Sequence, residues 1–243
     1  MNTPDILHLL QTGTIEVQGL LPWSSNYSFL VHVNGDAEMV VAVYKPRQGE
    51  RPLWDFPSGT LCQREVAAFH ISDGLGWNLV PPTILRRGPH GIGSVQQFIP
   101  HDPECHYFTF EGSADFRHAL QQIVLFDTII NNADRKGGHV LIEETEDAQP
   151  PNRLWTIDHG ICFHEEFKLR TVIWEFAGQP IPDDLLANLT HFQARLRPDL
   201  FPILQKLLSS AELLALEQRL NSIIRSRTFL QPGPGRHYPW PPV

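Results

Sequence analysis

The chain has 243 residues, which is long enough to bury a sizeable core and fits either one domain or two small lobes. Lys and Arg number 19 against 27 Asp and Glu, so the formal net charge is −8, and 42% of the residues are apolar. This composition excludes a disordered acidic chain. It also argues against duplex nucleic acid as the main partner, because no basic stripe is present to neutralise phosphates.

The cysteines and the N-terminal segment indicate in which cellular compartment the protein is expected. Cys62, Cys105 and Cys162 are far apart and form no CxxC pair, which fits free thiols in a reducing environment. The first ten residues contain no Lys or Arg, so the basic start of a secretory signal is missing. No apolar run approaches the roughly 20 residues that a membrane-spanning helix needs. We therefore expect a cytoplasmic protein without a membrane span.

The first hundred residues predict a β-rich region with one helix. Val, Ile, Phe and Tyr gather between turn-forming residues, which favours strands at 14–20, 28–33, 39–44, 83–86 and 93–99. Asn34-Gly35-Asp36 predicts a hairpin between the second and third strands. The pattern Thr60-x-x-Gln63 is typical of a capping box, so a helix is expected from residue 61 to about residue 75.

The second half of the chain predicts mainly helices. Ser113 is expected to cap a helix that reaches residue 131, because apolar residues recur there with helical spacing. An acidic, Pro-rich loop separates two short expected strands at 140–142 and 154–157. Two closing helices are expected at 183–197 and 202–224, and the segment 231–243 is expected to be irregular.

Lys45 and Glu65 are the first pair of candidate functional residues. Lys45 directly follows an apolar strand, and Glu65 lies on the helix that comes next. The residues one turn from Glu65 on that helix include Leu61 and Phe69, so its carboxylate lies on the apolar face. A carboxylate on a buried face needs a partner. Lys45 is the natural partner, and such an ion pair would hold the lysine rigidly enough to bind polyphosphate oxygens.

The polar run from Asn131 to His139 lies between a long apolar helix and a short strand. Such a run is compatible with a plain loop. However, an Asp, a Lys two residues later and a metal-capable side chain five residues later suit phosphoryl transfer. In that chemistry Asp134 orients or deprotonates the attacking hydroxyl, Lys136 offsets charge on the phosphoryl group, and His139 reaches a cation.

Asp158 ends the next short strand, and Gly160 lets the chain turn sharply after it. A carboxylate at a buried strand end is well placed to bind Mg²⁺, which takes one or two carboxylates together with phosphate oxygens. A Lys, a helix Glu, a loop Asp and an Asp-x-Gly segment follow one another along the chain. Protein-kinase-like phosphotransferases carry their functional residues in that order.

The run Asn-Asn-Ala-Asp-Arg-Lys-Gly-Gly-His at 131–139, with Asp-His-Gly at 158–160, resembles the catalytic and metal loops of the phosphatidylinositol 3- and 4-kinase-like family. From about residue 13 to about residue 227 the chain is similar to a bacterial group of that family, common in actinobacteria. The resemblance implies an α+β, two-lobed protein-kinase-like fold. Its expected parts are a β-rich N-terminal lobe at 1–98 with one helix, a mainly helical C-terminal lobe at 99–230, and a Pro- and Gly-rich tail at 231–243.

The resemblance also implies roles in catalysis and metal binding. Asp134 matches the catalytic Asp, with Arg135 and Lys136 as cations beside it. Asp158 matches the metal ligand of the Asp-x-Gly motif. His139 stands where kinases have an Asn that holds a second Mg²⁺, and imidazole is a softer ligand that suits Mn²⁺ better. His139 therefore shifts the metal preference, binds phosphate directly or marks lost turnover, and we expect activity with Mn²⁺ at least equal to that with Mg²⁺.

The remaining implied roles concern the nucleotide. Lys45 would bind its phosphates and Glu65 would hold Lys45. The chain has no G-x-G-x-x-G sequence, so backbone amides and hydroxyls of a turn must cover the phosphates. The residues expected in that turn are Ser24, Ser25 and Asn26. The hinge that touches adenine is expected at Gln97 and Phe98.

Other polar and aromatic residues have plainer interpretations. Asp127 is expected to be a buried carboxylate that accepts backbone N–H groups and stiffens the loop at Asp134. His101, Cys105 and His106 lack a matching second pair of ligands and are expected to lie in a surface loop. Trp54 is the tryptophan expected to line a ligand cleft.

Three functions compete at this stage. The first is an ATP-dependent phosphotransferase with nucleotide and Mg²⁺ or Mn²⁺ between two lobes. Its acceptor would be a protein hydroxyl or a small metabolite rather than clearly a lipid, since no basic patch or amphipathic membrane helix favours a lipid; transfer of a nucleotidyl group stays open. The second is an inactive nucleotide-binding pseudokinase that regulates a partner protein. The third is a metal-dependent hydrolase, which leaves the pairing of Lys45 with Glu65 unexplained.

Overall fold

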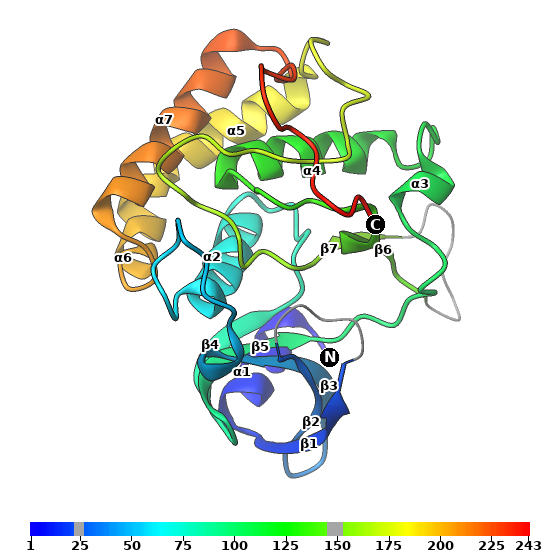
Figure 1. The fold of residues 1–243 in the computed structure, drawn as a ribbon, viewed down its shortest axis with the longest axis vertical. Coiled ribbons are helices and arrows are strands. Elements are labelled where there is room, and N and C mark those ends of the chain that lie inside the picture. The colour runs from blue at the N-terminus through cyan, green and yellow to red at the C-terminus, as the bar shows by residue number, and fades with distance from the viewer. Residues whose placement is uncertain (22–26, 145–152) are drawn as a thin grey trace.

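The computed structural model describes residues 1–21, 27–144 and 153–243. A five-stranded antiparallel sheet with one helix packed on it lies at one end, and a group of helices lies at the other (Figure 1). The strands follow the order β1-β2-β3-β5-β4. Their bounds are Thr14–Leu20 (β1), Phe29–Asn34 (β2), Met39–Pro46 (β3), Thr83–Gly88 (β4) and Gly91–Gln97 (β5).

Alternation along β3 decides where Lys45 points. Val40, Ala42 and Tyr44 are buried in a core between the sheet and α1, which spans Thr3–Thr12. Successive side chains of a strand point to opposite faces, so Lys45 points away from this core. We did not predict helix α1 from the sequence, although Asn2 is a residue type that often caps a helix. In the structure its side chain does so, by accepting from the backbone N–H of Asp5.

Helix α2, Leu61–Gly74, forms where the sequence predicts it, but its N-terminus is capped differently. The Thr60 hydroxyl donates to the carbonyl of Pro57 and makes no cap. The carboxylate of Glu50 instead accepts from the backbone N–H groups of Leu61 and Cys62, at 3.1 and 2.8 Å. The predicted capping box is therefore wrong, and a residue from the preceding loop takes its place.

The helical region contains α3 to α7 and a small two-stranded sheet. The helix predicted from Ser113 begins at Arg117, after Phe116, and the one predicted at 202–224 is divided into two, the second opened by a capping box of Ser209 and Glu212. The bounds are Tyr107–Phe110 (α3), Arg117–Ile130 (α4), Val140–Ile142 (β6), Leu154–Thr156 (β7), Asp183–Arg195 (α5), Phe201–Leu204 (α6) and Ser210–Ser226 (α7). Shorter turns of helix lie at Arg47–Gly49 (η1), Gly137–His139 (η2) and Leu196–Leu200 (η3).

The core is divided between the two regions. The larger part lies among α2, α4, α5 and α7 and includes Phe69 and Ile71, so α2 packs with the helical region although it precedes β4. A small third cluster of Ile99, Leu141 and Trp155 lies apart from both. The lobe boundary near residue 99 stays a prediction. None of the helices in the described part of the chain is long and apolar enough to cross a membrane.

The segment 231–243 contains no helix or strand, as predicted. It is nevertheless held in place. The carbonyl of Pro242 accepts from the backbone N–H of Gly137 at 2.8 Å, and the carbonyl of His237 accepts from that of Thr171 at 3.1 Å. In Figure 1 this segment, in red, runs past α4 toward β6 and β7.

Candidate active site

A cleft lies where β3, α2 and the loops around Asp134 and Asp158 meet. Its lining combines charged side chains with a few small and apolar residues. The described residues that line it are Tyr27, Lys45, Pro46, Glu50, Leu61, Cys62, Glu65, Asp134, Asp158, Gly160 and Ile161.

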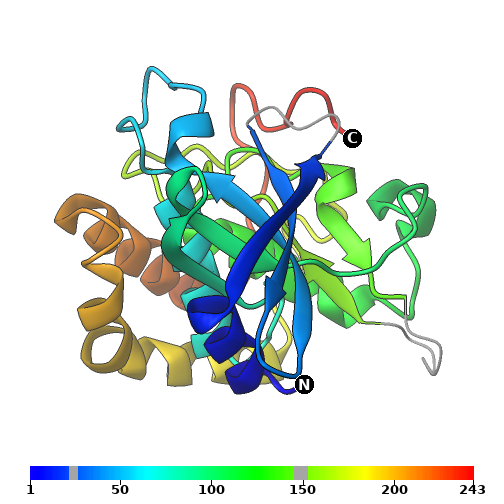
Figure 2. The ribbon, with the colours of Figure 1, turned by 90° about the horizontal axis from the view of Figure 1, so that it is seen from below.

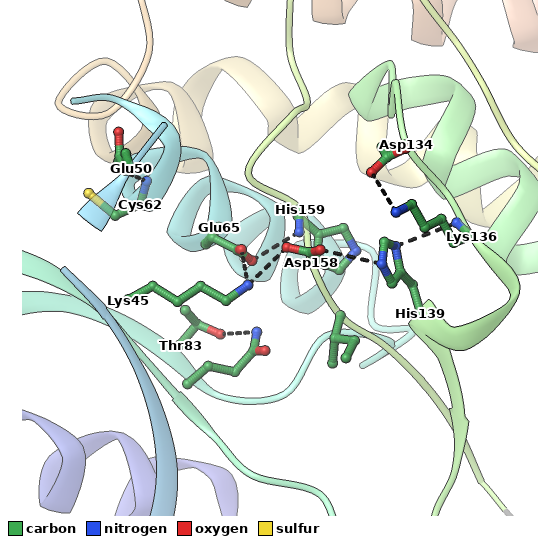
Figure 3. Close-up of polar contacts among 12 residues, drawn as sticks. Lys45, Glu50, Cys62, Glu65, Thr83, Asp134, Lys136, His139, Asp158 and His159 are labelled. Carbon is green, nitrogen blue, oxygen red and sulfur yellow. Dashed lines mark hydrogen bonds and ion pairs between the residues drawn. The ribbon is translucent and has the colours of Figure 1, made fainter. Parts of the chain in front are cut away.

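The predicted ion pair between Lys45 and Glu65 is present. Lys45 Nζ lies 2.5 Å from Glu65 Oε1 and 3.0 Å from Asp158 Oδ1, so one ammonium joins a strand, a helix and the loop after β7 (Figure 3). Burial alone would lower the pKa of Lys45, but the charges of Asp158 and Glu65 outweigh it and raise the pKa. Lys45 in turn is the main cause of the lowered pKa of Asp158. Both groups are therefore charged at neutral pH.

Glu65 also fixes the backbone beside Asp158. Its Oε2 accepts from the backbone N–H of His159 at 3.0 Å. Asp158 has a φ of 61°, in the left-handed region that Asp tolerates better than most residues. The Glu65 carboxylate, 4% exposed, thus holds both the lysine and the turn that presents Asp158.

Asp134 enters the cleft from the loop after α4. Its side chain is half-buried, and burial raises its pKa to about 6 against the opposing effect of Lys136. Lys136 Nζ lies 3.8 Å from Asp134 Oδ2. The backbone N–H of Asp134 donates to Asn132 Oδ1 at 3.0 Å, which fixes the loop at this residue.

Arg135 does not face the cleft, although the sequence places it among the catalytic cations. Its side chain is fully buried and pairs with Asp127, with Nε 2.8 Å from Oδ2. It also donates to the carbonyls of His139 and Ile157 and to His159 Nε2. The buried side chain of Arg135 therefore connects the loops around Asp134 and Asp158 from the interior of the protein.

Asp127 supports the loop in the way predicted but through other partners. Its carboxylate accepts from the guanidinium of Arg135 and from the side-chain amide of Asn132, not from backbone N–H groups. His159, fully buried, was missed as a member of this network. No spacing in the sequence marks it, because its partner lies 24 residues away.

His139 points toward Asp158, as Figure 3 shows, with Nε2 3.3 Å from Asp158 Oδ2. Burial lowers the pKa of His139 to about 4, although Asp158 opposes that shift. The imidazole is therefore neutral at pH 7. Its Nδ1 accepts a long hydrogen bond, 3.4 Å, from the backbone N–H of Lys136.

The predicted nucleotide contacts outside Lys45 and Glu65 stay predictions. Ser24, Ser25 and Asn26 lie outside the described residues. Gln97 and Phe98 are not among the described residues that line the cleft, and their backbone N–H groups donate to the carbonyls of Pro82 and Val41.

Trp54 and the segment around Cys105 also contribute nothing to the site. Trp54 is 93% exposed and lies beside Lys168 instead of lining the cleft, so that prediction is wrong. In the part of the chain that the structure describes, no group of three or more His, Cys, Asp and Glu side chains is arranged for a metal ion. His101, Cys105 and His106 lie, partly exposed, in the loop between β5 and α3, as predicted.

Glu50, Cys62 and Tyr27 line the cleft without having been predicted. Glu50 is there because it caps α2, a contact that spans 11 residues along the chain. An acidic residue in a loop before a helix start is the only signal that the sequence offers for it.

The fold has counterparts among solved structures. The Golgi casein kinase with Mn/ADP bound superposes with a TM-score of 0.64 over 92% of this chain and 74% of that chain, at 18% sequence identity. Identity at this level shows the fold alone. The chain thus has the protein-kinase-like, two-part α+β fold that the motif order predicts.

Sequence relatives define the family more narrowly. A family model described as phosphatidylinositol 3- and 4-kinase matches residues 86–198. Protein Rv2133c of Mycobacterium tuberculosis is 37% identical over 266 aligned positions, covering 96% of this chain and 94% of that protein. The chain therefore belongs to the bacterial phosphatidylinositol 3- and 4-kinase-like family that includes Rv2133c. Rice phosphatidylinositol 4-kinase gamma 4 is 32% identical, but that match covers 48% of this chain and 22% of the rice protein.

Proposed function

We propose that the protein is an ATP-dependent phosphotransferase that binds nucleotide and a divalent metal ion in this cleft. The observation that supports it most directly is the position of Lys45, whose ammonium lies between Glu65 and Asp158 while Asp134 lines the same cleft. A fixed cation, a metal-binding carboxylate and a base in one cleft are the groups that phosphoryl transfer requires.

Lys45 would bind phosphate oxygens of the nucleotide. Its ammonium stays charged because its pKa is raised, and Glu65 holds it in place. Its second contact, with the half-exposed carboxylate of Asp158, is open enough to be exchanged for phosphate. The Golgi casein kinase, which shares this fold, has Mn/ADP bound, and this supports nucleotide binding by the protein.

Asp158 and His139 are the residues that would hold the metal ion. The Asp158 side chain is 46% exposed and stays ionised, and the His139 imidazole beside it is neutral. Nε2 of His139 carries the ring proton while Nδ1 accepts from Lys136, so it would bind an ion once that proton moves to Nδ1 and the long hydrogen bond is given up. Two protein ligands fit an ion that takes its other ligands from phosphate oxygens, and the imidazole favours Mn²⁺ over Mg²⁺. The ion would neutralise charge on the transferred phosphoryl group.

Asp134 would act as the base. With a pKa of about 6 it is ionised at pH 7 and still more basic than an ordinary carboxylate. The acceptor hydroxyl would lose its proton to Asp134 as its oxygen bonds to the γ-phosphorus, while the bond from that phosphorus to the departing ADP oxygen breaks. Lys136, 3.8 Å from Asp134, would offset negative charge on the phosphoryl oxygens.

The acceptor we propose is a protein hydroxyl or a small metabolite. A net charge of −8 disfavours approach to an anionic membrane surface. The likeness to a plant lipid kinase covers only 22% of that enzyme.

Labelled ATP with Mn²⁺ or Mg²⁺ tests the proposal on the wild type, Asp134→Ala and Asp158→Ala, with the exposed Asp115→Ala as a control. We expect transfer by the wild type and the control and its loss in the two cleft variants. The competing function, an inactive nucleotide-binding module, is favoured by His139 in place of Asn. It would be supported if ATP raises the melting temperature and the wild type transfers nothing. No stabilisation by ATP with either metal would contradict both.

A further inference from the structure

Two consecutive residues of α2 bind opposite ends of the segment 158–162, called here the metal loop. Glu65 Oε2 accepts from the backbone N–H of His159 at 3.0 Å. Arg64 Nη1 donates to the carbonyl of Cys162 at 2.7 Å. Neighbouring residues on a helix diverge by about 100°, so the two side chains can reach ends of the loop that are three residues apart.

The same guanidinium connects the metal loop to α7. Arg64 Nη2 lies 2.5 Å from Glu212 Oε1, and Glu212 Oε2 accepts from the backbone N–H of Ser209 at 2.8 Å. The Arg64 side chain is 2% exposed, and its guanidinium lies 4.7 Å from the ring centroid of Phe56. A buried charge of this kind persists only when it is paired and hydrogen-bonded, which fixes the position of Arg64 closely.

Helix α2 is attached to the helical region at its other end too. Asn188 of α5 donates from its side-chain amide to the carbonyl of Leu75 at 3.1 Å. A Cβ on Gly74 would come within 2.8 Å of a methyl group of Leu200, so the helix packs directly against η3. Helix α2 is therefore attached to the helical region at both ends, while it also contacts β4 and β5 of the sheet.

This attachment bears on the Lys45 site. In protein kinases the ion pair between the strand lysine and the helix glutamate must be in place for activity, and movement of the helix controls it. In this protein the helix that carries Glu65 is α2. The buried ion pair between Arg64 and Glu212 attaches this helix to α7.

We propose that Arg64 is a positioning residue that holds α2 and the metal loop in the arrangement in which Glu65 binds Lys45. The consequence for catalysis rests on the proposed function, whereas the structural coupling does not.

Arg64→Lys is the first test, with Arg197→Lys as its matched control. Arg197 also pairs with a glutamate of α7, Glu217, but its side chain is 60% exposed. Lysine at position 64 can keep a contact with Glu212 but lacks the fork that reaches Cys162 at the same time. We expect hydrogen exchange of residues 158–163, measured without nucleotide, to accelerate about tenfold or more in Arg64→Lys and to be unchanged in Arg197→Lys.

Arg64→Met with Glu212→Gln separates positioning from stability. The glutamine can still accept from the Ser209 N–H and leaves no unpaired buried charge, so the melting temperature should lie above that of Arg64→Met alone. Cys162 still lacks its donor. Fast exchange in the metal loop should therefore persist, and the affinity for Mn²⁺·ATP, measured by calorimetry, should stay about tenfold or more below that of the wild type.

Two results would overturn the inference. One is unchanged exchange of residues 158–163 in Arg64→Lys. The other is a double variant that regains both the melting temperature and the protection of the metal loop, which would make Arg64 a stabilising residue only. If the wild type binds no nucleotide, the proposed function fails, and the exchange experiment still decides the role of Arg64.

Discussion

Asp127 and Asp158 each pair with a cation, but their surroundings differ. Asp127 is 1% exposed, and Arg135 and Asn132 bind its carboxylate from within the protein. Asp158 has a side chain that is 46% exposed and shares Lys45 with Glu65. The closed pair fixes the loops, and the open pair is the one that, in the proposed function, would exchange a partner for phosphate or metal. A charged pair near this cleft therefore indicates function only when one of its members is still accessible.

The contrast between an accessible and a buried charge is largest for the neighbours Asp134, which lines the cleft, and Arg135, which is fully buried. Asp134→Asn removes the proposed base without disturbing the buried pair, so we expect phosphoryl transfer to fall about 10²- to 10⁴-fold. The affinity for nucleotide should change little, because Lys45 is untouched. Single-turnover rates with labelled ATP, together with calorimetric titration of nucleotide, measure both. Unchanged transfer would show that another group takes the proton.

The same substitution at the two paired carboxylates tests the difference in burial. Asp127→Asn leaves the buried guanidinium of Arg135 without its counter-charge and should lower the free energy of unfolding by about 3–5 kcal/mol. Asp158→Asn should cost less than about 1 kcal/mol, because its pair is partly exposed and Lys45 keeps Glu65. Urea denaturation of both variants gives the two values. Equal costs would contradict the distinction.

The pH dependence of turnover should report Asp134. Its ionised form is the proposed base, and its pKa is about 6, so the rate should fall as pH drops below about 6, by up to tenfold per pH unit. Lys136 lowers the pKa of Asp134, so Lys136→Met should move this inflection to higher pH. A profile of kcat/KM against pH in both proteins decides the point, because this ratio reports groups of the free enzyme. An inflection that stays in place would assign the titration to another group.

The smallest expected effect concerns the metal preference. His139→Asn replaces an imidazole with an amide oxygen, so the ratio of turnover with Mn²⁺ to turnover with Mg²⁺ should fall by a few fold. Rates at saturating concentrations of each metal measure the ratio. A ratio that does not change would remove His139 from the proposed metal ligands.

The sequence predicted those parts of the site that follow from local chemistry. Glu65 was recognised because a carboxylate on an apolar helical face needs a partner, and Lys45 is that partner in the structure. His139 was placed by its distance along the chain from Asp134, and it points to Asp158.

Features that depend on long-range packing could not be predicted. Arg135 has the same sequence neighbours whether it faces the cleft or the interior, and only the position of Asp127 on α4 decides between them. Glu50 and Arg64 act on segments 11 and 98 residues away, where no spacing rule applies. The hinge at Gln97 and Phe98 stays a prediction, since the structure shows only that their backbone N–H groups donate to the carbonyls of Pro82 and Val41.

The contact between Pro242 and Gly137 has a practical consequence for how the protein is produced. Gly137 is closely packed, since a Cβ at this position would lie 3.0 Å from the Phe108 ring. The backbone N–H of Gly137 donates a hydrogen bond to the carbonyl of Pro242. An affinity tag or fluorescent domain fused after Val243 would be anchored next to the loop that carries Asp134. A fusion before Met1 would join α1 instead, and Figure 2 shows the two chain ends on opposite sides of the molecule. Assays of turnover should therefore use purification tags on the N-terminal side.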